Sequence, residues 1–102
     1  MKITHSLVQV MIALMDDPEG RHWGYDLSRR SGVRSGVLYP ILRRMVDEEW
    51  LTDGWEDSSE IKEGRPPRRY YVLTAEGVSH LGAVIQGARS DSRFRALTQR
   101  FA

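Results

Sequence analysis

Residues 35–47 read SGVLYPILRRMVD, and this stretch decides the fold. Its apolar residues recur every three or four positions, so the pattern predicts a helix with one buried face. That face would consist of Leu38, Ile41, Leu42, Met45 and Val46. We expect the helix to start at Ser35, which can act as its N-cap, or at Gly36. A cap at Gly36 would bring Pro40 nearer the first turn, where a proline costs little.

A shorter helix is expected immediately before this segment, across a tight turn. Residues 24–30 read GYDLSRR and are followed by Ser31-Gly32, where the glycine favours a helix end. Further upstream, residues 4–16 have apolar residues at helical spacing after Thr4, a candidate N-cap. The first half of the chain therefore predicts three helices, of which the second and third form a helix-turn-helix.

Two strands and a last helix are expected after residue 47. Residues 50–55 (WLTDGW) and 69–73 (RYYVL) have the composition of strands, and the polar residues 57–68 would form a long loop between them. Thr74 can cap a helix whose apolar pattern continues through Leu81, Val84, Ile85, Ala88, Phe94, Leu97 and Phe101. Its glycines, Gly77, Gly82 and Gly87, weaken that helix, which indicates either close packing against another helix or stability only in a dimer.

The order helix, helix, helix, strand, loop, strand, helix is that of a winged helix-turn-helix. We therefore expect a mainly α protein with a small two-stranded β wing (residues 50–73) and a C-terminal dimerisation helix. Residues 1–74 would form the winged helix-turn-helix DNA-binding domain, and residues 75–102 the C-terminal helix. In this fold the third helix enters the major groove of DNA and the wing flanks it.

The composition fits one globular domain and excludes several classes of function. The chain has 102 residues, 40% of them hydrophobic and 28% charged, and no cysteine, so it has no disulfide and no thiolate site. His5, His22 and His80 lack metal-ligand spacing and are expected at partly exposed positions. Without a Gly-rich phosphate loop, or a nucleophile placed beside a base, we expect no enzyme, no cofactor and no metal. The chain has no membrane-spanning apolar run and no signal-type segment, so the expected location is the cytoplasm.

The tryptophans Trp23, Trp50 and Trp55 lie in or beside the predicted extended segments. They could line a ligand site, but aromatic residues in such positions more often complete a core. We therefore expect them in the core.

Basic residues cluster around the predicted turn and in the wing. All 15 basic residues except Lys2 and Lys62 are arginines, which suit bidentate contacts with phosphate and guanine. Such a cluster forms either a solvated charged face or a DNA contact, and the order of the helices favours DNA. The predicted DNA-binding residues are Arg29, Arg34, Ser35, Gly36, Tyr39, Arg43 and Arg44 in the helix-turn-helix and Arg65, Arg68 and Arg69 in the wing.

The residue types indicate a role for each part of this set. The Ser35 hydroxyl and the amides at the helix N-terminus can bind a phosphate, and Gly36 permits close approach of a backbone. Arg43 would read bases, with Tyr39 four residues earlier on the same face. An arginine of the wing could enter the minor groove, unless the wing tip is a disordered polar loop.

Three segments carry motifs in combination: GYDL at residues 24–27, SGVLYPILRRM at 35–45, and GRPPRR at 64–69 running into YYVLTAEG at 70–77. In these segments the chain resembles the PadR family of regulators, over residues 7–81. The resemblance implies a winged-helix transcriptional regulator, usually a repressor, whose C-terminal helix packs against the first helix of a partner subunit. Members often respond to small aromatic or amphipathic molecules, so a small aromatic effector is a further partner to consider. The short C-terminal segment has no Trp, and an aromatic pocket at the dimer seam is not carried over.

The sequence thus predicts a homodimer, paired through its first and last helices, on double-stranded DNA. The two third helices would lie about 34 Å apart on a roughly palindromic site. The rival hypothesis is a winged-helix protein-interaction module whose basic surface binds an acidic protein partner. The acidic block at residues 47–63 keeps that alternative open.

Overall fold

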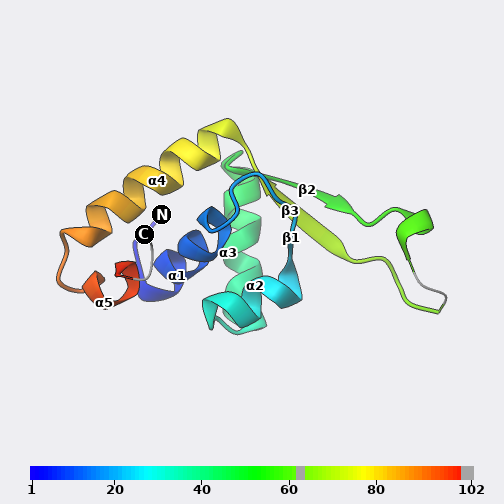
Figure 1. The fold of residues 1–102 in the computed structure, drawn as a ribbon, viewed down its shortest axis with the longest axis horizontal. Helices are drawn as coiled ribbons and strands as arrows, with labels where there is room; N and C mark the ends of the chain where they lie inside the picture. Colours follow the sequence, from blue (N-terminus) through cyan, green and yellow to red (C-terminus); the bar gives the residue numbers. More distant parts are fainter. Residues whose placement is uncertain (62–63, 100–102) are drawn as a thin grey trace.

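The computed structural model describes residues 1–61 and 64–99. In chain order its elements are α1 (His5–Met15), β1 (His22–Trp23), α2 (Gly24–Ser31), α3 (Ser35–Asp47), β2 (Leu51–Trp55), the 3-10 helix η1 (Ser58–Glu60), β3 (Arg69–Leu73), α4 (Ala75–Arg89) and α5 (Arg95–Thr98). In Figure 1, α1, α2 and α3 pack together, the β2–β3 hairpin projects away from them, and α4 runs back along α1. This arrangement confirms the predicted winged helix-turn-helix.

One hydrophobic core joins the first three helices, the sheet and α4. Its largest fully buried apolar side chains are Leu7, Met11, Leu14, Leu27, Leu38, Leu42, Met45, Leu51, Leu81 and Ile85. Since the burial of each such side chain contributes about 1.5 to 3 kcal/mol, this core fixes the packing of the helices and therefore the direction of the outer face of α3. Ile41 and Val46, also predicted for the buried face of α3, are half-buried at its margin.

The predicted caps of the first and fourth helices are confirmed. Thr4 Oγ1 accepts a hydrogen bond from the N–H of Leu7 at 3.1 Å, and Thr74 Oγ1 accepts one from the N–H of Gly77 at 2.9 Å. No helix of the described residues is long and apolar enough to cross a membrane.

The C-terminal apolar pattern continues past α4 into a shorter helix. Phe94 is buried with Val8 and Ala88 in a small second cluster, and Leu97 packs against that cluster. Phe101, which completed the predicted pattern, lies outside the described residues. These contacts pack the start of α5 against α1 and the end of α4.

The start of α3 differs from the expected cap. The N-cap is Arg34, with no side-chain capping bond, and the Arg34 carbonyl accepts the N–H of Leu38 at 2.8 Å. Ser35 is therefore the first helical residue and not the cap, and Pro40 lies inside the helix. Because proline has no N–H, the Gly36 carbonyl lacks its usual partner from residue 40. Gly36 is exposed, so water can bind that carbonyl.

The sheet has one more strand than predicted. The described strands pair in the antiparallel order β1-β3-β2, with His22 opposite Tyr71 in the first pair and Leu51 opposite Leu73 in the second. β1 has only two residues, too few for alternation to be visible in the sequence. Its partner is more than 40 residues away in the chain, so only the tertiary structure reveals the pairing.

Two expectations about aromatic residues were wrong in part. His22 is only 2% exposed, whereas all three histidines were expected at partly exposed positions. Trp50 is buried as expected, but Trp55 is 59% exposed at the end of β2, where the Arg69 guanidinium lies 4.9 Å from its ring centroid. That cation–π contact gives Trp55 a partner outside the core.

Candidate nucleic-acid interface

The outer face of α3 is exposed along its whole length. Burial of Leu38, Leu42 and Met45 turns the opposite side of the helix to solvent. The exposed positions of this face are Ser35, Gly36, Val37, Tyr39, Pro40, Arg43, Arg44 and Asp47. All the α3 residues predicted to bind DNA are therefore accessible together. Val37 joins them although the sequence had assigned it to neither face.

The turn before α3 is held by local hydrogen bonds. Gly32 ends α2 with a positive φ of 75°, a backbone conformation that glycine adopts without strain. Ser28 Oγ donates to the Val33 carbonyl at 2.7 Å, and the Val33 N–H donates to Ser31 Oγ at 3.1 Å. These bonds fix the direction in which the chain enters α3.

Arginine side chains surround the outer face of the helix-turn-helix without being neutralised. Arg29, Arg34 and Arg43 are exposed, and within the described part of the chain none of their side chains has an ion pair or a hydrogen bond. Arg44 has only an exposed contact with Glu48, at 3.6 Å, which is weak in water. The helix-turn-helix therefore presents four guanidinium groups that are available to a polyanion.

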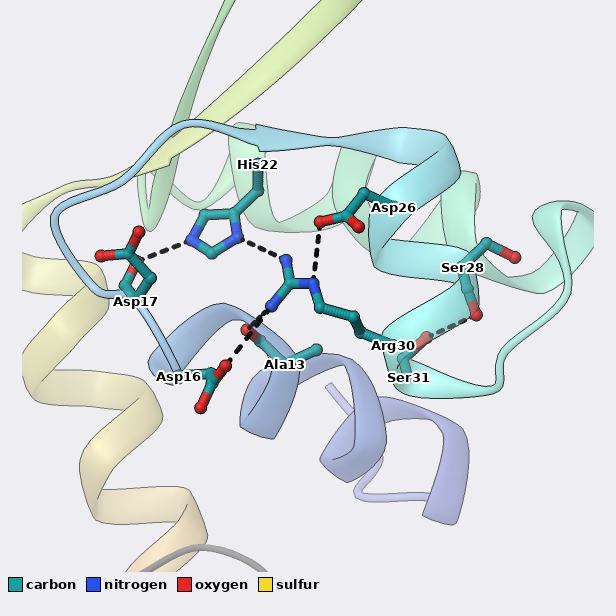
Figure 2. A network of polar contacts seen from close by, with 8 residues as sticks. All are labelled: Ala13, Asp16, Asp17, His22, Asp26, Ser28, Arg30 and Ser31. Atoms are coloured by element: carbon teal, nitrogen blue, oxygen red, sulfur yellow. Dashed lines mark hydrogen bonds and ion pairs between the residues drawn. The ribbon is translucent and has the colours of Figure 1, made fainter.

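Arg30 belongs to the same run of sequence but points the other way, into the molecule (Figure 2). It donates from Nη1 to the Ala13 carbonyl at 2.9 Å and from Nε to Asp26 Oδ2 at 2.8 Å. Its Nη2 lies 2.9 Å from His22 Nδ1. Because a guanidinium has donors only, His22 Nδ1 must be the acceptor. Arg30 thus connects the last turn of α1, the strand β1 and its own helix α2.

His22 completes this network in its neutral form. With Nδ1 accepting from Arg30, the ring proton is on Nε2, which donates to the Asp17 carbonyl at 2.7 Å. Burial lowers the pKa of His22 from its usual 6.5; the hydrogen bond to Asp17 opposes this shift, and the charge of Arg30 adds a smaller lowering effect. The network in Figure 2 therefore has one partly exposed cation, Arg30, and a buried neutral imidazole beside it.

The side chain of Tyr39 lies across the start of α2. A Cβ atom built on Gly24 would be 2.2 Å from Tyr39 Oη, so any larger residue at position 24 would have to displace the Tyr39 ring. Tyr39 remains 46% exposed, with one edge against α2 and the other in solvent. The GYDL and LYP motifs, 15 residues apart, are thus parts of one contact.

Acidic residues form ion pairs with two of the three wing arginines. Arg65 Nη2 lies 2.8 Å from Glu56 Oε1, as an ion pair without hydrogen-bond geometry, and Arg69 Nε lies 3.2 Å from Asp53 Oδ2. Arg68 has no ion pair among the described residues, and its guanidinium lies 5.9 Å from the Trp23 ring. Part of the acidic block therefore neutralises the wing, and Arg68 is its most available cation.

A groove of about 510 Å³ separates α3 from the sheet. Its lining residues are Tyr39, Pro40, Arg43, Val46, Asp47, Asp53, Arg69 and Tyr71. Burial raises the pKa of the Tyr71 phenol, although the nearby Arg69 opposes the shift, so this group is neutral. The groove brings α3 and wing residues to one side of the molecule. Arg65 and Arg68 lie in the segment that precedes β3, in the hairpin that extends away from the helices (Figure 1).

The comparison with protein families identifies one family for this chain. The family model described as "Transcriptional regulator PadR-like family" matches residues 13–83. No curated protein matches the chain.

Solved structures of bacterial regulators share the fold. A PadR family transcription regulator from Clostridium difficile R20291 is 22% identical, with a TM-score of 0.63 over 90% of this chain and 96% of that one. A PadR family transcriptional regulator from Eggerthella lenta DSM 2243 is 21% identical, with a TM-score of 0.65 over 92% and 84%. BpsR of Bordetella bronchiseptica, whose DNA binding is regulated by 6-hydroxynicotinic acid, is 16% identical, with a TM-score of 0.67 over 95% of this chain and 65% of its own.

Proposed function

Because the chain belongs to the PadR-like family of transcriptional regulators, we propose that it represses transcription as a homodimer bound to a roughly palindromic operator. Membership of this family confirms that the chain is a DNA-binding transcriptional regulator and not an enzyme. The observation that carries the finer proposal is the set of three exposed, unpaired arginines, Arg29, Arg34 and Arg43, on the outer face of the helix-turn-helix. A DNA-binding regulator acts where the DNA is, so the cytoplasm is the proposed location.

In the proposed complex, α3 lies in the major groove and each side chain has a distinct task. Arg43 reads a base, and Tyr39 contacts the same region while resting on Gly24. Ser35 and the N-terminal amides of α3 bind a phosphate, together with Arg29 and Arg34. Apart from its own helix backbone and chain neighbours, no atom of the described residues lies within 4 Å of a Cβ built on Gly36, so a DNA backbone could approach closely there. Arg44 and Arg68 also bind phosphates. Arg65 and Arg69 can bind phosphates only after they release their carboxylate partners, Glu56 and Asp53.

Dimerisation is proposed through α1 and α4. Both helices carry apolar side chains that the single chain covers only in part, namely Ile12 and Met15 on α1 and Val84 on α4. A second copy would cover them and hold two α3 helices about 34 Å apart, one turn of DNA. Sedimentation equilibrium should give a dimer mass at micromolar concentration. A stable monomer at that concentration would contradict this part of the proposal.

Selection of binding sites from random duplex DNA tests the function directly. An enriched palindrome with half-sites about one helical turn apart is expected. The three unpaired arginines assigned to phosphates in each subunit, Arg29, Arg34 and Arg68, correspond to about six phosphate contacts in the dimer, so log affinity should fall with log salt concentration with a slope of about −5. No enrichment and a shallow slope, with tight binding to an acidic protein, would favour the protein-interaction module.

The Arg43→Ala variant should lose about 1 to 3 kcal/mol of binding free energy on the selected operator and much less on random DNA. The reason is that a base contact discriminates between sequences, whereas a phosphate contact does not. Competition binding at one fixed salt concentration measures both affinities.

The matched control for this variant is Arg68→Ala, which removes an unpaired arginine from the wing. It should weaken operator and random DNA to similar extents and, because the dimer loses two phosphate contacts, reduce the steepness of the salt slope by about two units. Equal weakening of both DNAs by Arg43→Ala would instead assign Arg43 to a phosphate.

A small aromatic effector stays a prediction. The groove between α3 and the sheet, with Tyr39 and Tyr71 beside Arg43 and Arg69, is the site we propose to examine for it. BpsR, which shares the fold, is regulated by 6-hydroxynicotinic acid. An effector in this groove would contact Arg43 and would therefore compete with DNA.

A further inference from the structure

Part of the outer face near the N-terminus of α3 is apolar, beside the polar side chains of Ser35 and Tyr39. Val37 is 47% exposed, and the neighbouring Pro40 and Gly36 are also exposed. None of these residues has a side-chain hydrogen-bond donor or acceptor. The patch formed by Gly36, Val37 and Pro40 therefore cannot read DNA by side-chain hydrogen bonds, unlike the neighbouring Tyr39 and Arg43.

The position of this patch argues against incidental exposure. A single apolar side chain on a surface needs no explanation, but here adjacent positions of one helix face form a continuous patch. Val37, Pro40 and Arg44 follow one another at helical spacing along one side of α3, and Arg34 immediately precedes the helix. Arginines thus flank the patch at both ends. If they bind phosphates of the two strands, the patch between them faces the base edges.

The chemistry of the major groove limits what such a patch can recognise. Thymine presents a C5-methyl group there, whereas the other three bases present mainly hydrogen-bond donors and acceptors. A donor or acceptor pressed against valine would lose its water without gaining a partner, which is unfavourable. We infer that α3 recognises thymine methyl groups through Val37 and Pro40, so that each half-site carries a thymine at the contacted position. The inference rests on the proposed DNA-binding function and adds the chemical class of its target.

A scan with deoxyuridine tests the inference without altering the protein. Deoxyuridine keeps the hydrogen-bonding groups of thymine and lacks only the methyl, so each thymine of the selected operator is replaced in turn. Removing one contacted methyl should weaken binding of the unmodified protein about fourfold, and removing both symmetry-related methyls about 15-fold. Thymines outside the contacted position should show little effect.

Protein variants then assign the effect to Val37. Val37→Ala should bind the thymine and deoxyuridine operators almost equally, and Val37→Thr, which keeps the shape of valine, should retain only part of the preference. Val72→Ala, which truncates a half-buried valine of β3, should keep the full fourfold ratio.

The outcomes separate this inference from the proposed function. An enriched operator with no methyl effect at any thymine overturns the inference and leaves the proposed function standing. A methyl effect that Val37→Ala and Val37→Thr both preserve also overturns it, because another residue must then contact the methyl. Failure to select any operator overturns the proposed function together with the inference.

Discussion

Replacing Gly77 by alanine should lower the free energy of unfolding by about 3 kcal/mol or more. A Cβ atom at this position would lie 2.0 Å from the carbonyl oxygen of Trp50 and 2.8 Å from its carbonyl carbon. Both are backbone atoms, and the oxygen already accepts the N–H of Thr74 at 3.0 Å. The Trp50 ring is fixed as well, stacked on His80 with a centroid distance of 3.9 Å. The alanine methyl could be accommodated only by moving α4 away from the α3–β2 junction.

Gly82→Ala provides the matched control in the same helix. Beyond its own helix backbone and chain neighbours, a Cβ at position 82 would meet, among the described residues, only Met15 Cε within 4 Å, at 3.9 Å, an ordinary contact. Since alanine favours a helix over glycine, this variant should gain about 0.5 to 1 kcal/mol. Urea unfolding followed by circular dichroism, at one protein concentration for all variants, measures both. Equal effects of the two substitutions would show that the close approach of Gly77 to the Trp50 carbonyl does not constrain the position of α4.

The Arg30→Met variant should lose about 2 to 4 kcal/mol of stability at neutral pH. Methionine fills a similar volume but leaves the Ala13 carbonyl and the buried His22 Nδ1 without their donor. It also removes the hydrogen bond to Asp26. Urea unfolding at pH 7.5 measures the loss. An unchanged urea midpoint would show that water satisfies the Ala13 carbonyl and His22 Nδ1 as well as the guanidinium does.

Arg29→Met is the control because Arg29 is the preceding residue and is exposed. Its stability should stay within about 0.5 kcal/mol of the unmodified protein, since no contact in the described structure is lost. Its affinity for the operator should nevertheless fall, because Arg29 is a proposed phosphate contact. Two adjacent arginines would then separate stability from DNA binding.

His22 should make the stability depend on pH. Burial, followed by the charge of Arg30, lowers the pKa of His22 below 6.5 in the folded chain. In the unfolded chain the residue returns to its usual pKa, so the unfolded state binds the proton first as the pH falls. The free energy of unfolding should therefore decrease as the pH falls below about 6.5, toward the lower folded-state pKa. Protonation would also place a second cation against Arg30, faced by Asp16, Asp17 and Asp26 and, from β3, by Tyr71.

Unfolding midpoints at pH 7.5 and 5.5 measure this dependence. His22→Gln should reduce the difference between the two pH values, because glutamine does not titrate. A difference that is as large in His22→Gln as in the unmodified protein would assign the pH dependence to other groups.

Local patterns in the sequence were sufficient to determine the class of fold. The buried stripe of α3, the Thr4 and Thr74 caps and the order of helices and strands all depend on residues within a few positions of one another. Backbone geometry places such residues in fixed relation, so periodicity and capping can be read without knowledge of the rest of the chain. The motifs at residues 24–27, 35–45 and 64–77 carried the resemblance to the PadR family.

Only the tertiary structure decided which members of the basic clusters are available to DNA. Arg29 and Arg30 are adjacent and identical in type, yet Arg30 is bound by α1 and β1, whereas Arg29 is exposed. In the wing, Asp53 forms an ion pair with Arg69, and Glu56 forms one with Arg65. The sequence showed only that acidic and basic blocks alternate. The approach of Gly77 to Trp50, of Gly24 to Tyr39 and of β1 to β3 has the same character. Each pairs groups 8 to 49 positions apart, and their meeting depends on how the whole core packs and not on the period of any one segment.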